Sequence, residues 1–107
     1  MTFTLHDLEK RIAERASATA DISYTRKLLD KGVAQCAKKF GEEAVEAVLA
    51  ATGESRERLI SEGADVLYHL LVVLKARDVA LADIEAELQA RTARSGLDEK
   101  ASRKGGN

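Results

Sequence analysis

The sequence of 107 residues contains no proline, no tryptophan and only one cysteine, and aromatic residues make up 4% of it. A single cysteine excludes an internal disulfide bond and a thiolate cage around a metal, so we expect a reducing compartment, the cytoplasm. Cys36 itself fits a small buried helix residue better than a reactive thiol. Alanine, leucine, glutamate, lysine and arginine dominate instead, and all five are strong helix formers. The composition therefore predicts an all-α fold and argues against a β-sandwich.

An excess of charge and long apolar runs are also lacking. Lysine and arginine number 17 against 18 aspartate and glutamate, which gives a formal net charge of -1. No overall positive field exists to hold nucleic acid without sequence specificity, so we expect no nucleic-acid partner. The longest aliphatic run is Leu70 to Leu74, and the N-terminus has no cationic segment followed by an apolar stretch. We therefore expect neither export nor a membrane-spanning segment.

The length corresponds to one domain with a single core. Apolar spacing, capping residues and glycines predict helices over Leu5 to about Ala16, Tyr24 to Lys31, Val33 to about Thr52, Arg56 to about Arg77 and Leu81 to about Arg94. The predicted N-caps are Thr4, Ser23 and Ser55. Residues 1–94 are interpreted as a four-to-five-helix antiparallel bundle. Residues 95–107 are polar and glycine-containing, and they are interpreted as a tail that is ordered only if something holds it.

The helix predicted over residues 56–77 carries acidic residues away from its natural solvent face. That face comprises Glu57, Ser61, Ala64, Tyr68 and Lys75, and the arc expected to be buried comprises Leu59, Ile60, Leu67, Leu70, Leu71 and Leu74. Glu62 and Asp65 share a different stripe with His69, and valines flank it. A buried carboxylate must have a cation or become protonated. The pair therefore indicates a cation site.

The preceding helix repeats this pattern. Its predicted core stripe comprises Val33, Ala37, Phe40, Ala44 and Val48, while Glu43 and Glu46 project along one edge and Glu42 lies further round. A short connection makes the two helices antiparallel, so their acidic pairs should converge. An all-oxygen donor set suits Mg²⁺, or Mn²⁺, better than Zn²⁺ or iron. A di-iron bundle would need Glu-x-x-His on two helices, and His69 is the only histidine in the predicted helical core.

A simpler interpretation treats these acids as surface charge. Lys39 with Glu43, or Lys38 with Glu42, has the i, i+4 spacing of a helix ion pair worth about 0.3 to 0.5 kcal/mol. The chain would then be a non-catalytic helical dimerisation module. Two acidic pairs on adjacent helices, one of them among valines, favour the metal site. His69, one turn beyond Asp65, either orients that carboxylate from behind or is an ordinary core histidine.

The acidic pattern resembles the signature of a known superfamily. Glu42-Glu43-Ala44-Val45-Glu46, followed by Glu62-Gly63-Ala64-Asp65, is similar to the E-E-x-x-E…E-x-x-D motif of the all-α nucleoside triphosphate pyrophosphohydrolases, the MazG-like and dimeric dUTPase superfamily. Tyr24-Thr25-Arg26-Lys27-Leu28 and Ser95-Gly96-Leu97-Asp98-Glu99-Lys100 narrow the resemblance to the phosphoribosyl-ATP pyrophosphohydrolase family of histidine biosynthesis. The resemblance covers nearly the whole chain. Because no cysteine-rich or histidine-rich cyclohydrolase domain accompanies it, the free-standing form is expected.

The resemblance implies Mg²⁺-dependent hydrolysis of the α-β phosphoanhydride of phosphoribosyl-ATP to phosphoribosyl-AMP and pyrophosphate. The implied metal ligands are Glu43, Glu46, Glu62 and Asp65, and Glu42 or Glu46 is the implied base. The residues expected to bind substrate are Tyr24, Lys27, Lys38 and Lys39, with Arg26, and Ser95, Lys100 and Arg103 of the tail. A house-cleaning pyrophosphohydrolase acting on dNTPs shares the acidic motif and is the alternative within this superfamily.

A homodimer is expected from the same helical pattern. The helix predicted over residues 56–77 is apolar around most of its circumference and needs cover on most sides. So short a chain cannot supply that cover, so two copies should share a bundle core.

Overall fold

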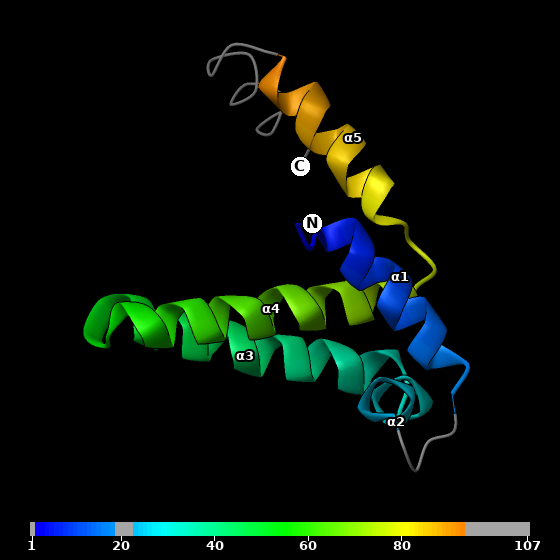
Figure 1. Ribbon diagram of the computed structural model, residues 1–107, viewed down its shortest axis with the longest axis horizontal. Coiled ribbons are helices and arrows are strands. Elements are labelled where there is room, and N and C mark those ends of the chain that lie inside the picture. Colours follow the sequence, from blue (N-terminus) through cyan, green and yellow to red (C-terminus); the bar gives the residue numbers. More distant parts are fainter. Residues whose placement is uncertain (1, 19–22, 94–107) are drawn as a thin grey trace.

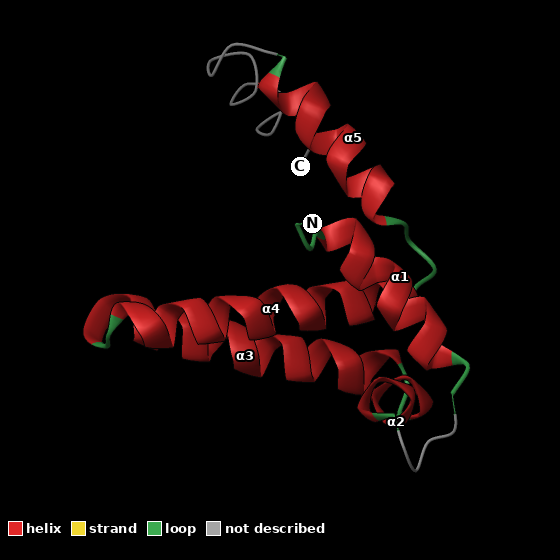
Figure 2. Ribbon diagram, viewed as in Figure 1, coloured by secondary structure: helices red, strands yellow, loops and turns green. Residues whose placement is uncertain are grey.

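The computed structural model describes residues 2–18 and 23–93, and within these ranges every regular element is a helix (Figure 2). The helices are α1 (Leu5–Ala16), α2 (Tyr24–Asp30), α3 (Val33–Gly53), α4 (Arg56–Ala76) and α5 (Leu81–Thr92). The predicted all-α class is confirmed. The observed helices end within one or two residues of the predicted boundaries. None of the helices in the described ranges is both long and apolar enough to cross a membrane.

The three predicted N-caps are confirmed. The Asp7 N–H donates to the Thr4 hydroxyl over 3.1 Å, and the Thr4 N–H donates to the Asp7 carboxylate over 2.9 Å. This reciprocal capping box lowers the pKa of Asp7, because backbone and hydroxyl donors stabilise its ionised form. Ser23 and Ser55 accept backbone N–H groups at the starts of α2 and α4. Gly32, with φ at 97°, allows the abrupt change of direction between α2 and α3.

Helices α3 and α4 form a long antiparallel hairpin, connected by Glu54 and Ser55 (Figure 1). Buried and half-buried positions of α3 recur four and three residues apart, at Cys36, Phe40, Glu43, Ala47 and Ala50. The matching positions of α4 include Glu62, Asp65, His69, Val72 and Ala76. This spacing is that of a coiled-coil seam. The acidic residues Glu43, Glu62 and Asp65 therefore belong to the seam between the two helices.

The predicted core stripe of α3 is wrong in part. Phe40 and Ala44 are half-buried, but Val33, Ala37 and Val48 are exposed, and Val48 retains 61% of its accessible surface. The observed seam is turned from the predicted stripe by roughly 80°, at about 100° per residue. Small side chains, Ala47 and Ala50, lie on the seam and let α4 approach closely. The apolar pattern identified the hydrophobic residues of α3 but did not identify the face of α3 that packs against α4.

The apolar core lies at one end of the hairpin, where α1 and α2 pack across it (Figure 1). Its buried members are Ile12, Leu28, Cys36, Leu71, Val72 and Leu81. Cys36 is buried as predicted, its thiol donates to the Leu28 carbonyl over 3.2 Å, and burial raises its pKa. Helix α5 points away from the hairpin. The start of α5 is attached to α1, because the N–H of Leu81, the first residue of α5, donates to the Glu9 carboxylate over 2.8 Å.

The predicted faces of α4 are confirmed at one end only. Leu71 is buried and Leu70 and Leu74 are half-buried, whereas Leu59, Ile60 and Leu67, also predicted to be core, are 41%, 56% and 42% exposed. No other helix in the described part of this single chain covers those three. Tyr68 was predicted to face solvent but is half-buried, because α2 packs there and Thr25 hydrogen-bonds its hydroxyl at 2.5 Å. Burial raises the pKa of Tyr68.

Candidate functional site

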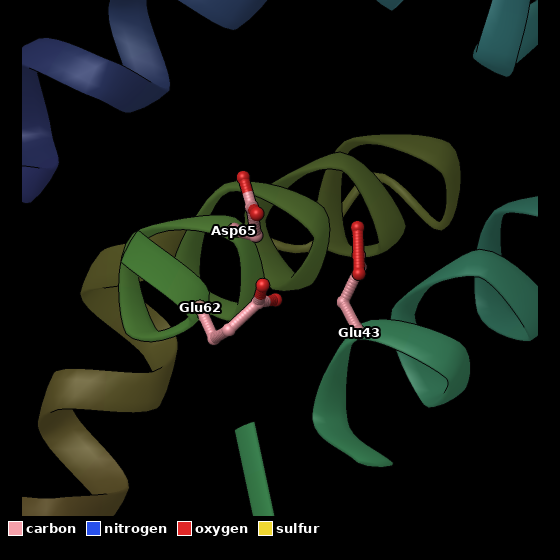
Figure 3. Close-up of side chains that lie close together, drawn as sticks. All are labelled: Glu43, Glu62 and Asp65. Carbon is pink, nitrogen blue, oxygen red and sulfur yellow. The ribbon is translucent and has the colours of Figure 1, made fainter. Parts of the chain in front are cut away.

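Three carboxylates converge in the seam between α3 and α4. Glu43 comes from α3, and Glu62 and Asp65 come from α4 (Figure 3). One oxygen atom of each lies within 4.8 Å of one oxygen atom of the other two. Glu62 is only 6% exposed, and the other two are half-buried. Carboxylates so close together in a partly dry environment repel one another, so the cluster requires positive charge.

The local sequence explains how these residues meet. Glu62 and Asp65 are three residues apart, so they lie on one face of α4. The two-residue connection reverses the chain and brings the middle of α3, where Glu43 lies, beside them. We call this set of three residues the acidic cluster. Oxygen donors at this spacing reach one Mg²⁺ or Mn²⁺ ion directly or through its water ligands, so the donor set fits the predicted cation.

Two basic side chains already contact the acidic cluster. The Arg58 guanidinium donates from Nη2 to Glu62 Oε1 over 2.6 Å and from Nε to Glu54 Oε1 over 3.1 Å. The hydrogen bond to Glu54, followed by the charge of Glu62, raises the pKa of Arg58. Lys39 Nζ lies 4.0 Å from Glu43 Oε1. Arg58 was not among the residues predicted for the site, although its position four residues before Glu62 was a usable signal.

The other two predicted acidic residues do not join the cluster. Glu46, predicted as a ligand and as a possible base, is exposed and outside the group formed by Glu43, Glu62 and Asp65. It lies one helical turn from Glu43, rotated away from the seam. Glu42, the other predicted base, is also exposed. The roles of Glu42 and Glu46 therefore stay predictions.

His69 contacts the main chain of Asp65 rather than its carboxylate. The ring is 5% exposed, and Nδ1 lies 2.8 Å from the Asp65 carbonyl oxygen. A carbonyl only accepts, so Nδ1 carries a proton and donates to it. Nε2 lies 3.5 Å from the Tyr24 hydroxyl, and the Tyr68 ring meets the imidazole edge-on with centroids 4.9 Å apart. The predicted supporting role of His69 behind Asp65 stays a prediction.

The predicted substrate-binding residues are spread over α2 and α3. Tyr24, Lys27 and Lys38 are exposed, and Lys39 is half-buried beside Glu43. Arg26, by contrast, is engaged within the fold: Nη1 donates to the Ala18 carbonyl and Nε donates to the Asp30 carboxylate, both over 2.9 Å. The three remaining predicted contacts lie outside the described residues, and these are Ser95, Lys100 and Arg103.

Comparisons with known proteins identify the family of this chain. The family model described as phosphoribosyl-ATP pyrophosphohydrolase matches residues 5–92. The chain is 63% identical over 102 residues to phosphoribosyl-ATP pyrophosphatase 1 of Bradyrhizobium diazoefficiens, an alignment covering 95% of this chain and 96% of that protein. It is 58% identical over 102 residues to phosphoribosyl-ATP pyrophosphatase of Allorhizobium ampelinum, covering 95% of this chain and 98% of that protein. The resemblance seen in the sequence is confirmed, and the chain belongs to the phosphoribosyl-ATP pyrophosphohydrolase family.

Proposed function

We propose that this chain hydrolyses the α-β phosphoanhydride of phosphoribosyl-ATP, with a divalent cation, to give phosphoribosyl-AMP and pyrophosphate in histidine biosynthesis. The observation that carries the proposal is the convergence of Glu43, Glu62 and Asp65 inside a chain that matches this family over residues 5–92. Relatives named for phosphoribosyl-ATP favour that substrate over the dNTPs of the wider superfamily. We place the reaction in the cytoplasm, where the buried free thiol of Cys36 remains reduced.

The acidic cluster is the proposed holder of Mg²⁺, with Mn²⁺ as the alternative. A bound Mg²⁺ would neutralise the charge of the triphosphate and make its water ligand more acidic. Glu43, Glu62 and Asp65 would hold the ion at a fixed place in the seam, because the helices α3 and α4 fix the positions of the three residues. Their partial burial excludes competing water from one side of the site, which strengthens attraction for a cation.

Glu42 and Glu46 are the proposed proton acceptors. Both are exposed carboxylates on α3, one residue before and three residues after Glu43. Their exposure makes both carboxylates accessible to a water molecule. Lys27, Lys38 and Lys39, with Tyr24, are the proposed contacts for the phosphates, on their places in the family resemblance, and Lys39 lies beside the acidic cluster, with Nζ 4.0 Å from Glu43 Oε1. We propose the same role for Ser95, Lys100 and Arg103, on their membership in the family motif alone.

We further propose that the active form is a homodimer. Leu59, Ile60 and Leu67 of α4 and Val48 and Leu49 of α3 are large apolar side chains that retain 41 to 61% of their surface. Four of the five, Val48, Leu49, Leu59 and Ile60, lie close to the connection between α3 and α4, and this end of the hairpin is opposite to the end where α1 and α2 pack (Figure 1). Contiguous exposed apolar residues on a small protein mark an association surface. A second copy offers the same residues in return, as twofold interfaces require.

Substitution of Glu62 tests the function. Glu62→Gln should lower pyrophosphate release from phosphoribosyl-ATP in the presence of Mg²⁺ by at least about 100-fold, because it removes the most buried charge of the acidic cluster. The melting temperature in EDTA should stay constant or rise, since one of three mutually repelling carboxylates is gone. Glu57→Gln, an exposed acid on the first turn of α4, is the matched control and should keep normal activity.

The same assay compares the substrates. Phosphoribosyl-ATP should be hydrolysed in strong preference to each dNTP, and EDTA should stop the reaction without reducing the helical circular dichroism signal. Near-normal turnover by Glu62→Gln would refute the proposed metal site. A preference for dNTPs would favour the house-cleaning alternative. No pyrophosphate release from any nucleotide, together with no Mg²⁺-linked rise in melting temperature, would favour a non-catalytic dimerisation module.

A further inference from the structure

We propose that Arg58 is an internal counter-ion of the acidic cluster, which neutralises Glu62 while no divalent cation is bound and is displaced from Glu62 when one binds. This inference rests on the proposed function, because it takes the acidic cluster as the divalent-cation site. It assigns Arg58 a role in tuning cation affinity rather than a contact with substrate.

The contact between Arg58 and Glu62 is short and unequal in burial. Arg58 Nη2 lies 2.6 Å from Glu62 Oε1, a separation typical of a charge-assisted hydrogen bond. The Glu62 side chain is 8% exposed and that of Arg58 is 50% exposed. Burying a carboxylate costs free energy unless positive charge lies beside it, and Arg58 supplies that charge from the solvent side.

A divalent cation and Arg58 compete for the same carboxylate. An ion held by Glu62 would lie within a few ångströms of the guanidinium, and like charges at that distance repel strongly. Arg58 has an alternative partner: its Nε already donates to Glu54 Oε1 over 3.1 Å, and Glu54 is 40% exposed. Release from Glu62 therefore leaves the guanidinium with one ion pair and with access to water. The displacement requires a rotation of an exposed side chain and no rearrangement of the core.

Lys39 makes a weaker contact of the same kind on the other helix. It precedes Glu43 by four residues, as Arg58 precedes Glu62. Because α3 and α4 are antiparallel, these two basic residues approach the acidic cluster from opposite ends. The Lys39 Nζ to Glu43 Oε1 distance of 4.0 Å is at the limit of an ion pair. We therefore expect Lys39 to affect cation affinity in the same direction as Arg58, but less.

The experiment measures Mn²⁺ binding by electron paramagnetic resonance and thermal melting in EDTA, on the full chain without substrate. Arg58→Gln should tighten Mn²⁺ binding by about tenfold in Kd, equivalent to about 1.4 kcal/mol, and should lower the melting temperature in EDTA. Arg58→Lys, which keeps the charge, should retain a Kd near that of the wild type. The matched control is Arg91→Gln, because Arg91 pairs on α5 with Glu87, four residues before it, at 3.0 Å, as Arg58 pairs with Glu54. It should leave Mn²⁺ affinity unchanged.

Two outcomes separate this inference from the function on which it depends. If the wild type binds Mn²⁺ and Arg58→Gln binds it equally or more weakly with normal circular dichroism, Arg58 is no competitor and the inference is wrong while the metal site stands. If the wild type binds no Mn²⁺ in the millimolar range or below, the metal site itself is wrong and the inference is overturned with it. If Arg91→Gln tightens Mn²⁺ binding as much as Arg58→Gln does, the change in affinity comes from the net charge of the protein alone, and the inference is wrong.

Discussion

The two halves of α4 carry the same apolar stripe but stand in different surroundings. Ile60, Leu67, Leu71 and Leu74 follow one another along one side of the helix. Leu71 is 4% exposed and Leu74 is half-buried, whereas Ile60 and Leu67 are 56% and 42% exposed. The difference comes from the elements that pack on α4: Leu71 belongs to the same buried core as Ile12 of α1, and that core includes neither Ile60 nor Leu67. An apolar stripe thus predicts which side of a helix needs cover but not which partner provides it.

The two halves of α4 also differ in what they contribute to the protein, since one supplies core residues and the other supplies residues of the proposed site. The covered half of α4 contributes Leu71 and Val72 to the core. The uncovered half carries Glu62 and Asp65, the acidic pair of the proposed metal site. Mutual repulsion among the cluster carboxylates is a cost to folding that the well-packed half offsets.

The largest expected effect is the loss of the homodimer when the uncovered half is made charged. Ile60→Asp should raise the dimer dissociation constant by at least about a thousandfold, or about 4 kcal/mol, because a carboxylate would be buried without a partner at the interface. Sedimentation velocity measures the change. Ser61→Asp, at the neighbouring exposed position, is the control and should remain dimeric. A monomeric wild type would show that the stripe has another function.

The next effect compares Leu71 with Leu67, one turn apart on the stripe. In the Ile60→Asp background, which removes the dimer, Leu71→Ala should cost roughly 2 to 5 kcal/mol of unfolding free energy because it leaves a core cavity. Leu67→Ala should cost less than about 1 kcal/mol, since Leu67 is outside the buried core and 42% of its surface is already exposed to water. Urea denaturation followed by circular dichroism gives both values. Equal costs would mean that both halves of α4 are covered within one chain.

The sequence predicted the elements of this fold more fully than their packing. The starts of α1, α2 and α4 followed from capping hydroxyls, those of Thr4, Ser23 and Ser55, whereas α3 and α5 begin without a side-chain cap. The convergence of Glu43 with Glu62 and Asp65 was also predictable, because helix periodicity and a short connection suffice to place them. The inward face of α3 and the burial of Tyr68 could not be predicted from the sequence, because both depend on where segments distant in the sequence pack. Glu46 lay next to the seam, where a rotation of 60° decides whether a side chain joins the site.

A smaller effect is expected from residues that belong to neither half of α4. Truncation after Arg94 removes Ser95, Lys100 and Arg103, which the family motif assigns to substrate. We expect kcat/KM for phosphoribosyl-ATP to fall by about tenfold, equivalent to about 1.4 kcal/mol of transition-state stabilisation. The melting temperature and the dimer should be almost unchanged, because the predicted core lies before residue 94. Full activity of the truncated chain would remove the tail from the proposed substrate-binding residues.

The smallest effect is expected where α2 meets the covered half of α4. Tyr68→Phe removes the hydroxyl that bonds Thr25 in a half-buried setting, so it should cost about 1 kcal/mol of unfolding free energy. Because burial raises the pKa of Tyr68, the folded chain keeps its hydroxyl neutral, and the cost should be constant between about pH 6 and 9.

Above about pH 10 the unfolded tyrosine ionises before the folded one, which favours unfolding of the wild type and should narrow the difference between the two proteins. Tyr24→Phe is the matched comparison, since the Tyr24 ring is 53% exposed and its hydroxyl lies 3.5 Å from His69 Nε2. It should lower stability less than Tyr68→Phe but raise KM, since Tyr24 is a proposed substrate contact. The reverse pattern, a loss of stability from Tyr24→Phe and a loss of activity from Tyr68→Phe, would exchange the structural and functional roles of the two tyrosines.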